Sequence, residues 1–259
     1  MDIGTTLVAR LGHLVATAGP FGCAMALVAG CGQTPDLFGD HTTTDGSGGA
    51  GGTGGGGTGG GGGGVVRVAV MDGTMATDDL RAYLDGQPDI EAEMLNACIL
   101  GELMNFDVVV VHGQMACFES DDFDTYVVNG GGLIGVPWIH DYGELIALPV
   151  VPDVVHKETG SPLEIFAVEP DDPLLQNVAF HDGDVVGYER GALPHRPEAV
   201  VSARWGDSSN TSAVVRWVKG GGRSVYLNFL YVHSCCPSAV DYDWGKQLVR
   251  NAVRWAAGD

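Results

Sequence analysis

Short apolar runs and helix-like spacing of apolar residues alternate along most of the chain. Residues 65–71, 107–112 and 133–136 are rich in valine, leucine and isoleucine, which is typical of strands buried on both faces. Helical spacing follows the first two runs, beginning near Thr77 and at Ser120. This order of strand, helix and strand predicts an α/β fold with a mostly parallel sheet.

The rest of the pattern extends that sheet and closes it with a helix. Further strands are predicted at residues 90–95, 163–168, 199–204, 213–218 and 224–230, and helices at residues 99–104 and 244–257. The last helix carries Leu248, Val249, Ala252 and Val253 on one side, so it has an apolar face to bury. The predicted architecture is a three-layer α/β/α sandwich around a mostly parallel central sheet.

The beginning of the chain has the pattern of a secretory signal. An apolar run extends from about Leu14 to Gly30, with Arg10 upstream. It ends in Leu27-Val28-Ala29-Gly30-Cys31, a lipobox, in which small residues precede a cysteine. In precursors of this class the thiol is diacylated and cleavage follows. We therefore predict a lipoprotein signal peptide at residues 1–30 and a lipid anchor on Cys31.

Two alternatives remain for this region. The run could be a transmembrane helix, although it spans only 17 residues, contains Gly19-Pro20 and is followed by no Lys or Arg stop signal. Cys31 could also be an ordinary thiol of a secreted protein. The lipoprotein hypothesis places the protein in the bacterial cell envelope, lipid-anchored and extracytoplasmic, in the periplasm or at the cell surface.

A glycine-rich segment separates the signal from the folded part. Residues 46–64 contain 15 glycines in 19 positions, so they offer almost no side chains for a core. We interpret residues 31–64 as a flexible tether with a span of roughly 30 Å. Residues 65–259 then form one domain of ordinary size.

The charge of the domain limits its partners. The chain has a net charge of −20, and the domain holds 12 of the basic and 29 of the acidic residues, a formal charge of −17. Such a surface repels phosphate backbones, which excludes nucleic acid as a partner. Anionic membrane surfaces would not attract it either. The membrane is therefore expected as a partner only through the N-terminal lipid.

Four cysteines follow Cys31, and they indicate no metal centre. Cys98, Cys117, Cys235 and Cys236 allow three disulfide connectivities, and the pairing stays open. Their spacing matches no zinc ribbon, and no histidine pair has the spacing of metal ligands on a helix. We predict no metal and no cofactor.

Several stretches of the domain are similar in sequence and order to the ThuA-like (trehalose-utilisation) family. They are Phe106-Asp107-Val108-Val109-Val110, Asn129-Gly130-Gly131-Gly132-Leu133-Ile134-Gly135, Glu169-Pro170-Asp171-Asp172-Pro173-Leu174, Gly222-Arg223-Ser224-Val225-Tyr226 and Asn251-Ala252-Val253-Arg254-Trp255. The resemblance implies the fold of class I glutamine amidotransferases, which is flavodoxin-like, and an activity loosely tied to sugars. The chain departs from the family at Pro137 and Asp172, where histidine is common, and near His233.

The sequence argues against two kinds of catalysis. Amidotransferases need a cysteine in a G-x-C-x-G elbow, and the domain has none, so Cys117 is interpreted as a structural thiol. A serine hydrolase of the G-x-S-x-G type is excluded in the same way. Whether the protein is an enzyme stays open. A carbohydrate-directed, hydrolase-like activity is the form we would expect.

Polar and aromatic residues follow several predicted strands. The candidate ligand-binding residues are His112, Trp138, His140, Asp141, Glu144, Tyr188, Glu189 and His233, with Tyr142 as a second ring that could stack on a sugar. The carboxyl ends of parallel strands meet at one edge of a sheet, where ligands of such folds bind. We therefore predict a carbohydrate-binding or carbohydrate-processing site at this edge. The alternative is a non-catalytic interaction domain of a cell-envelope assembly.

Overall fold

The computed structural model describes ten segments of the chain. They are residues 64–71, 78–96, 98–112, 120–139, 145–151, 154–158, 164–181, 183–206, 211–231 and 238–259. All of them lie within one compact unit, Gly55–Asp259. The predicted signal peptide, with the lipidation site Cys31, lies outside the described residues, as does the tether up to residue 63.

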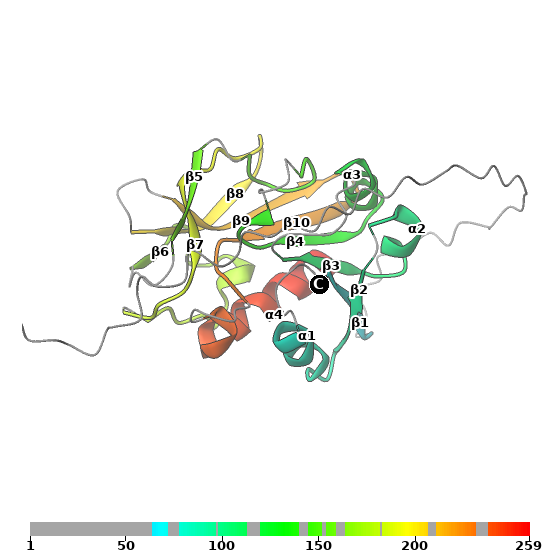
Figure 1. Cartoon of the computed structure of the whole chain (residues 1–259), viewed down its shortest axis with the longest axis horizontal. Coiled ribbons are helices and arrows are strands. Elements are labelled where there is room, and N and C mark those ends of the chain that lie inside the picture. The colour runs from blue at the N-terminus through cyan, green and yellow to red at the C-terminus, as the bar shows by residue number, and fades with distance from the viewer. Residues whose placement is uncertain are drawn as a thin grey trace, which may run out of the picture. The chain divides into compact units, whose positions relative to one another are not determined.

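A mixed sheet of eight strands forms the centre of the domain, in the order β2-β1-β3-β4-β10-β9-β8-β6 (Figure 1). The strands are β1 (Val66–Met71), β2 (Ile90–Leu95), β3 (Val108–Val111), β4 (Gly132–Gly135), β6 (Ile165–Ala167), β8 (Val200–Trp205), β9 (Ser212–Lys219) and β10 (Gly222–Leu227). The five strands from β2 to β10 in this order run parallel, whereas β9, β8 and β6 continue the sheet in antiparallel pairs. A separate antiparallel pair joins β5 (Val154–Glu158) and β7 (Tyr188–Ala192).

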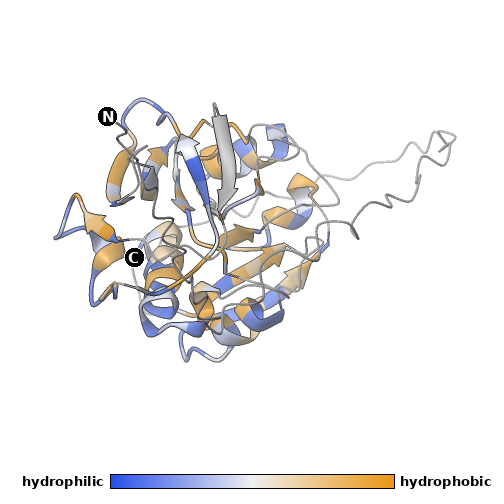
Figure 2. Cartoon of the chain, turned by 60° about the vertical axis from the view of Figure 1, so that its left-hand side comes forward, coloured by the Kyte–Doolittle hydropathy of each residue, from blue (hydrophilic) through white to orange (hydrophobic). Residues whose placement is uncertain are grey.

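Helices cover both faces of the sheet, which confirms the predicted three-layer α/β/α sandwich (Figure 1). One face packs against α1 (Asp78–Asp85) and α4 (Asp243–Ala257), and the other against α2 (Leu100–Leu103) and α3 (Ser120–Val128). The 3-10 helices η2 (Pro173–Leu175) and η3 (Ala239–Asp241) lie in the connections. Figure 2 shows hydrophobic ribbon in strands at the centre of the domain and on parts of the helices.

The long helix α4 is built from its apolar face. Leu248, Val249, Ala252 and Val253 are fully buried in the core that also contains β1, β3 and β10 residues. The helix ends at Gly258, whose φ of 107° places it in the left-handed region that glycine adopts without strain. Together these features explain why residues 243–257 form the helix that the sequence predicted.

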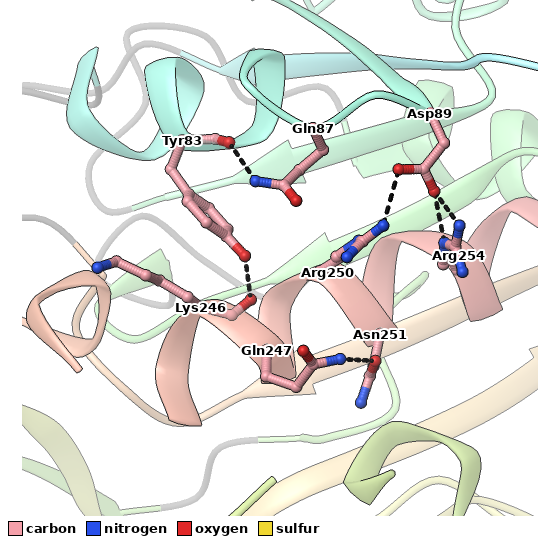
Figure 3. Close-up of polar contacts among 8 residues, drawn as sticks. All are labelled: Tyr83, Gln87, Asp89, Lys246, Gln247, Arg250, Asn251 and Arg254. Atoms are coloured by element: carbon pink, nitrogen blue, oxygen red, sulfur yellow. Dashed lines mark hydrogen bonds and ion pairs between the residues drawn. The ribbon is translucent and has the colours of Figure 1, made fainter. Parts of the chain in front are cut away.

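Polar bonds fasten α4 to α1 and to the turn before β2 (Figure 3). The Tyr83 hydroxyl donates to the carbonyl of Lys246 at 3.0 Å. Asp89 accepts from Arg250 at 3.0 Å and also from Arg254. The two arginines lie one turn apart on the same side of α4, so a single carboxylate bonds to both.

Two glycines are required by close approaches between layers. A Cβ atom on Gly132 would lie 2.7 Å from the carbonyl oxygen of Ala256 in α4. A Cβ atom on Gly222 would lie 2.2 Å from the carbonyl oxygen of Val127 in α3. Glycine at these positions therefore lets β4 approach α4 closely and lets β10 approach α3 closely.

Asp172 anchors the irregular segment to the sheet. It is 3% exposed and precedes η2, where its Oδ1 accepts from the Leu174 amide at 2.9 Å. Its Oδ2 accepts from the Ser202 hydroxyl at 2.8 Å and from Arg216 Nε at 2.6 Å. Asp172 thus makes an ion pair in which its own carboxylate is buried, and the pair holds the segment to the sheet.

The predicted strands agree with the structure except at some ends and in the irregular middle. The last one was predicted to reach Leu230, but β10 ends at Leu227 because the next amides leave the ladder: Leu230, for example, donates to Gly187. The β5–β7 pair was not predicted, because its short strands lie among turn residues. None of the helices in the described segments is long and apolar enough to cross a membrane.

Candidate functional site

The carboxyl ends of β3, β4 and β10 lie side by side and carry polar residues. Val111 pairs with Gly135, and Gly135 pairs with Tyr226, so the three strands end at the same edge of the sheet. His112 directly follows β3, and Asn228 directly follows β10. We call this edge the rim site: hydrogen bonds join Trp138, Glu189, Tyr226 and Asn228 there, and His112 belongs to it through its position at the end of β3.

Glu189 lies at the centre of the polar contacts of the rim site. It is 1% exposed, and its Oε1 accepts from the main-chain amide of Trp138 at 2.7 Å. Its Oε2 accepts from the hydroxyl of Tyr226. Burial and the negative charge of Glu189 raise the pKa of Tyr226 well above its usual value, so this phenol remains a neutral donor.

Asn228 fixes the main chain on which Glu189 is carried. Its Oδ1 accepts from the amide of Glu189 at 2.7 Å, and its Nδ2 donates to the carbonyl of Glu189 at 2.7 Å. The same Nδ2 also donates to the carbonyl of Ser212 at 2.8 Å. One side chain therefore joins β7 and β9 at the end of β10 and sets the position of the carboxylate.

Trp138 adopts an unusual backbone conformation at the rim. Its φ is 71°, in the left-handed region that few residues other than glycine occupy. The residue lies three positions after β4, and the bond from its amide to Glu189 accompanies this conformation. Because such strain persists only where surrounding contacts impose it, the turn after β4 is a built feature of the rim.

His112 is buried at the end of β3 with its hydrogen-bonding capacity unused. It is 0% exposed, and within the segments that the structure describes neither ring nitrogen has a hydrogen-bond partner. Burial lowers the pKa of His112 to about 4, an effect that its own main chain only partly offsets. At neutral pH the ring is therefore uncharged, with one nitrogen able to donate and the other able to accept.

The structure brings together some of the predicted site residues. Trp138 and Glu189 are hydrogen-bonded, and His112 ends the strand next to the one that leads to Trp138. Tyr188 is in the core instead, where its ring stacks on Trp205 at 4.3 Å between ring centroids. The other predicted residues, His140, Asp141, Tyr142, Glu144 and His233, lie outside the described residues.

Tyr226 and Asn228 belong to the rim site but were missed from the sequence. Tyr226 lies within an apolar strand and resembles an ordinary core residue. Asn228 stands between apolar residues just after that strand, and an isolated amide in such a position is a signal that could have been used.

Among the described residues, no group of three or more histidine, cysteine or acidic side chains is arranged to hold a metal ion. The chemistry present at the rim consists of a carboxylate, a phenol, a carboxamide and a neutral imidazole. The first three are bonded to one another or to the main chain, whereas the neutral imidazole of His112 has no partner among the described residues. A hydroxyl group would suit it, because a hydroxyl both donates and accepts.

These features define an open α/β sandwich with a polar cluster at its strand ends, where ligands bind in such folds. No family model matches the chain, and no curated protein matches it. Solved structures are similar in fold.

A ThuA-like protein from Bacteroides uniformis superposes with a TM-score of 0.55 and 12% identity, covering 74% of this chain and 91% of its own. Two proteins from Salmonella typhimurium described as cytoplasmic give TM-scores of 0.54 and 0.56, with 18% and 13% identity. They cover 74% and 73% of this chain and 99% and 98% of their own. The domain therefore has the ThuA-like fold, as the sequence resemblance implied.

Proposed function

We propose that this protein binds a carbohydrate at the rim site. The observation that carries the proposal is His112 at the end of β3, a fully buried imidazole whose two ring nitrogens have no hydrogen-bond partner among the described residues. A buried polar group without partners costs about 1–3 kcal/mol, so its presence at a strand end calls for an explanation. A ligand hydroxyl would supply the missing hydrogen bond.

The charge of the protein selects among ligands. The domain's formal charge of −17 and the carboxylate of Glu189 disfavour anions. The neutral His112 ring and the neutral Tyr226 phenol favour an uncharged partner with several hydroxyl groups. A neutral sugar has this chemistry, and an aromatic residue, Trp138, stands at the same edge with its main-chain amide bonded to Glu189.

A binding panel tests the proposal on the full chain carrying Cys31→Ser, which removes the expected site of acylation. Thermal unfolding is recorded with neutral mono- and disaccharides, followed by titration calorimetry of any sugar that stabilises the protein. A bound sugar at 100 times its Kd should add about 2.7 kcal/mol to the free energy of unfolding.

Two variants separate binding from the general effect of sugars on stability. His112→Leu should lose the stabilisation, and His181→Leu, which replaces an exposed histidine, should retain it. A general solvent effect would be equal in all three proteins. Equal responses across the panel would contradict the proposal.

We also propose that the protein is a lipoprotein of the cell envelope, anchored through Cys31 and presented outside the cytoplasm on the glycine-rich tether. The support is the lipobox together with Cys98, which is disulfide-bonded. Structural disulfides persist in oxidising compartments and are rare in the cytosol, so this bond agrees with export.

Acylation gives a direct test of the anchor. The wild-type protein should incorporate labelled fatty acid and sediment with membranes, and Cys31→Ser should do neither. Cys23→Ser, which leaves the lipobox cysteine in place, is the matched control and should behave like the wild type. Membrane association of Cys31→Ser, with no label on the wild type, would overturn the lipoprotein proposal.

The burial of the candidate residues favours a second candidate function. Tyr188 and Glu189 are 1% exposed, and both are held by core contacts. A domain whose rim residues serve only the scaffold would be a non-catalytic interaction domain of an envelope assembly. The sugar panel distinguishes the two, because this candidate expects no ligand-dependent difference between His112→Leu and its control.

A further inference from the structure

A serine and a histidine meet at the edge of the rim site. The Nε2 atom of His195 lies 2.6 Å from the Oγ atom of Ser212, which is within the range of a strong hydrogen bond. Ser212 is buried, and His195 is partly exposed. The two residues are 17 positions apart in sequence and come from different elements, so only the fold pairs them.

The main chain holds Ser212 firmly. It is the first residue of β9, and its carbonyl accepts from Asn228, the residue that also fixes Glu189. The pairing of β8 with β9 is irregular beside it, with register shifts between Val201 and Ala203 and between Ala203 and Arg204. Bulges of this kind commonly re-aim side chains near functional sites.

The main chain around His195 is held by residues 149–151. It forms an isolated antiparallel bridge with Val150. The amide of Val151 donates to the carbonyl of Pro194 at 2.7 Å, and the amide of Arg196 donates to the carbonyl of Pro149 at 2.9 Å. Neighbouring residues on both sides are thus bonded to the 149–151 segment, and the imidazole is carried on a fixed strand-like backbone.

The surroundings keep the imidazole in its basic form. Burial lowers the pKa of His195, and the positive charge of Arg204 lowers it further. A neutral histidine at physiological pH can accept a proton, which is what a general base must do. In the tautomer protonated on Nδ1, the Nε2 atom accepts the bond from the Ser212 hydroxyl.

We propose that Ser212 and His195 form a nucleophile–base pair that transfers an acyl group from a carboxylic ester to water. The Ser212 oxygen attacks the ester carbonyl carbon while His195 Nε2 takes its proton. The carbon–oxygen bond to the alcohol then breaks, and the alcohol leaves with that proton. A water molecule, deprotonated by the same nitrogen, cleaves the acyl-enzyme, releases the carboxylic acid and returns the proton to Ser212.

The pair escapes detection by sequence because it does not use a nucleophile elbow. Ser212 opens an antiparallel strand, so no G-x-S-x-G pattern surrounds it, and the absence of that pattern argues only against a hydrolase of the elbow type. The proposed reaction depends on the distance between the two side chains and on the protonation state of His195. It does not depend on whether the protein binds a carbohydrate.

Covalent labelling tests the pair without a known substrate. The full chain carrying Cys31→Ser is treated with a fluorophosphonate, and intact mass and peptide mapping locate the adduct. We expect one adduct on Ser212, none in Ser212→Ala, and labelling slowed at least 100-fold in His195→Gln. Ser224→Ala, which removes a buried serine from the neighbouring strand β10, should label like the parent.

The pH dependence and the ester assay complete the test. The labelling rate should fall on acidification at a lower pH than for an ordinary histidine, whose pKa is 6.5, because the pKa of His195 is lowered. Hydrolysis of p-nitrophenyl acetate should follow the same profile and the same variants. If Ser212 stays unlabelled in the folded parent protein, or if His195→Gln is labelled at the parent's rate, the proposal is overturned whether or not a sugar binds.

Discussion

Two buried polar side chains in this domain differ in whether other groups of the described protein hydrogen-bond to them. Asp172 is satisfied by a main-chain amide, the hydroxyl of Ser202 and the guanidinium of Arg216. His112 is equally buried, yet across the described segments its two ring nitrogens meet no donor or acceptor. The first arrangement holds η2 to β8 and β9, and the second leaves a strand end chemically incomplete.

The contrast separates stability from function. A buried ion pair adds little net stability, but breaking it leaves the remaining charge without compensation. An unsatisfied imidazole costs stability as it stands, and removing it relieves that cost. Substitution at the two sites should therefore change the free energy of unfolding in opposite directions.

The largest expected effect comes from Asp172→Ala. Loss of the carboxylate leaves the partly buried Arg216 and the Ser202 hydroxyl unpaired, which should cost about 3–5 kcal/mol of unfolding free energy. Urea denaturation measures it. Asp171→Ala, at the exposed neighbouring position, should change stability by less than about 0.5 kcal/mol. Equal effects at the two positions would show that the ion pair is unimportant.

A smaller change in the free energy of unfolding is expected from the protonation of His112 as the pH falls. Its folded pKa, about 4, lies below its ordinary value of 6.5, so the unfolded chain binds the proton more readily. Stability is then fully present above 6.5 and is lost as the pH falls toward 4. Relative to His112→Leu, the wild type should lose roughly 2 kcal/mol between pH 7.5 and pH 5.

Urea denaturation of both proteins at several pH values checks this difference. His112→Leu should also be at least as stable as the wild type at pH 7.5, because it removes an unsatisfied group of similar size. Parallel pH profiles for the two proteins would mean that His112 is not buried as the structure shows.

The smallest effect is expected at Asp89, which bonds to Arg250 and Arg254 at the surface of α4 (Figure 3). Burial raises the pKa of Asp89, but the bonds from Arg254 and Arg250 outweigh it and lower the pKa below 3.8. Its contribution is therefore present above that pH and is lost on further acidification.

Because the three side chains of this cluster are partly exposed, Asp89→Asn should cost no more than about 1 kcal/mol at pH 7. Urea denaturation in low and high salt checks the value, and high salt should shrink it. A loss as large as that of Asp172→Ala would contradict the distinction between buried and exposed pairs.

Much of the fold could be predicted from the sequence because its signals are local. The valine-rich runs at β1 and β3 indicate buried strands, and the apolar face of α4 indicates a helix packed on a core. The pair β5 and β7 could not be predicted, because its pairing joins distant, short segments. The buried ion pair between Asp172 and Arg216 is likewise a tertiary contact between residues 44 positions apart.

The candidate site was predictable only in part. The position of His112 at a strand end follows from topology, and Glu189 was chosen for its chemistry. That Glu189 would bond to the amide of Trp138, and that Tyr226 and Asn228 would hold it, depends on how separate loops meet. The periodicity of the sequence does not predict hydrogen bonds between residues of separate loops.

The most direct test of the central claim is the state of the His112 ring in solution. Nitrogen-15 spectra of histidine-labelled protein give the protonation of each ring, and His112→Leu identifies the signal by its loss. We expect a ring that stays neutral down to about pH 5 and a shift of its nitrogen resonances when a stabilising sugar is added. A ring that titrates near pH 6.5 and ignores saturating sugar would contradict both the buried, unsatisfied state and the ligand site.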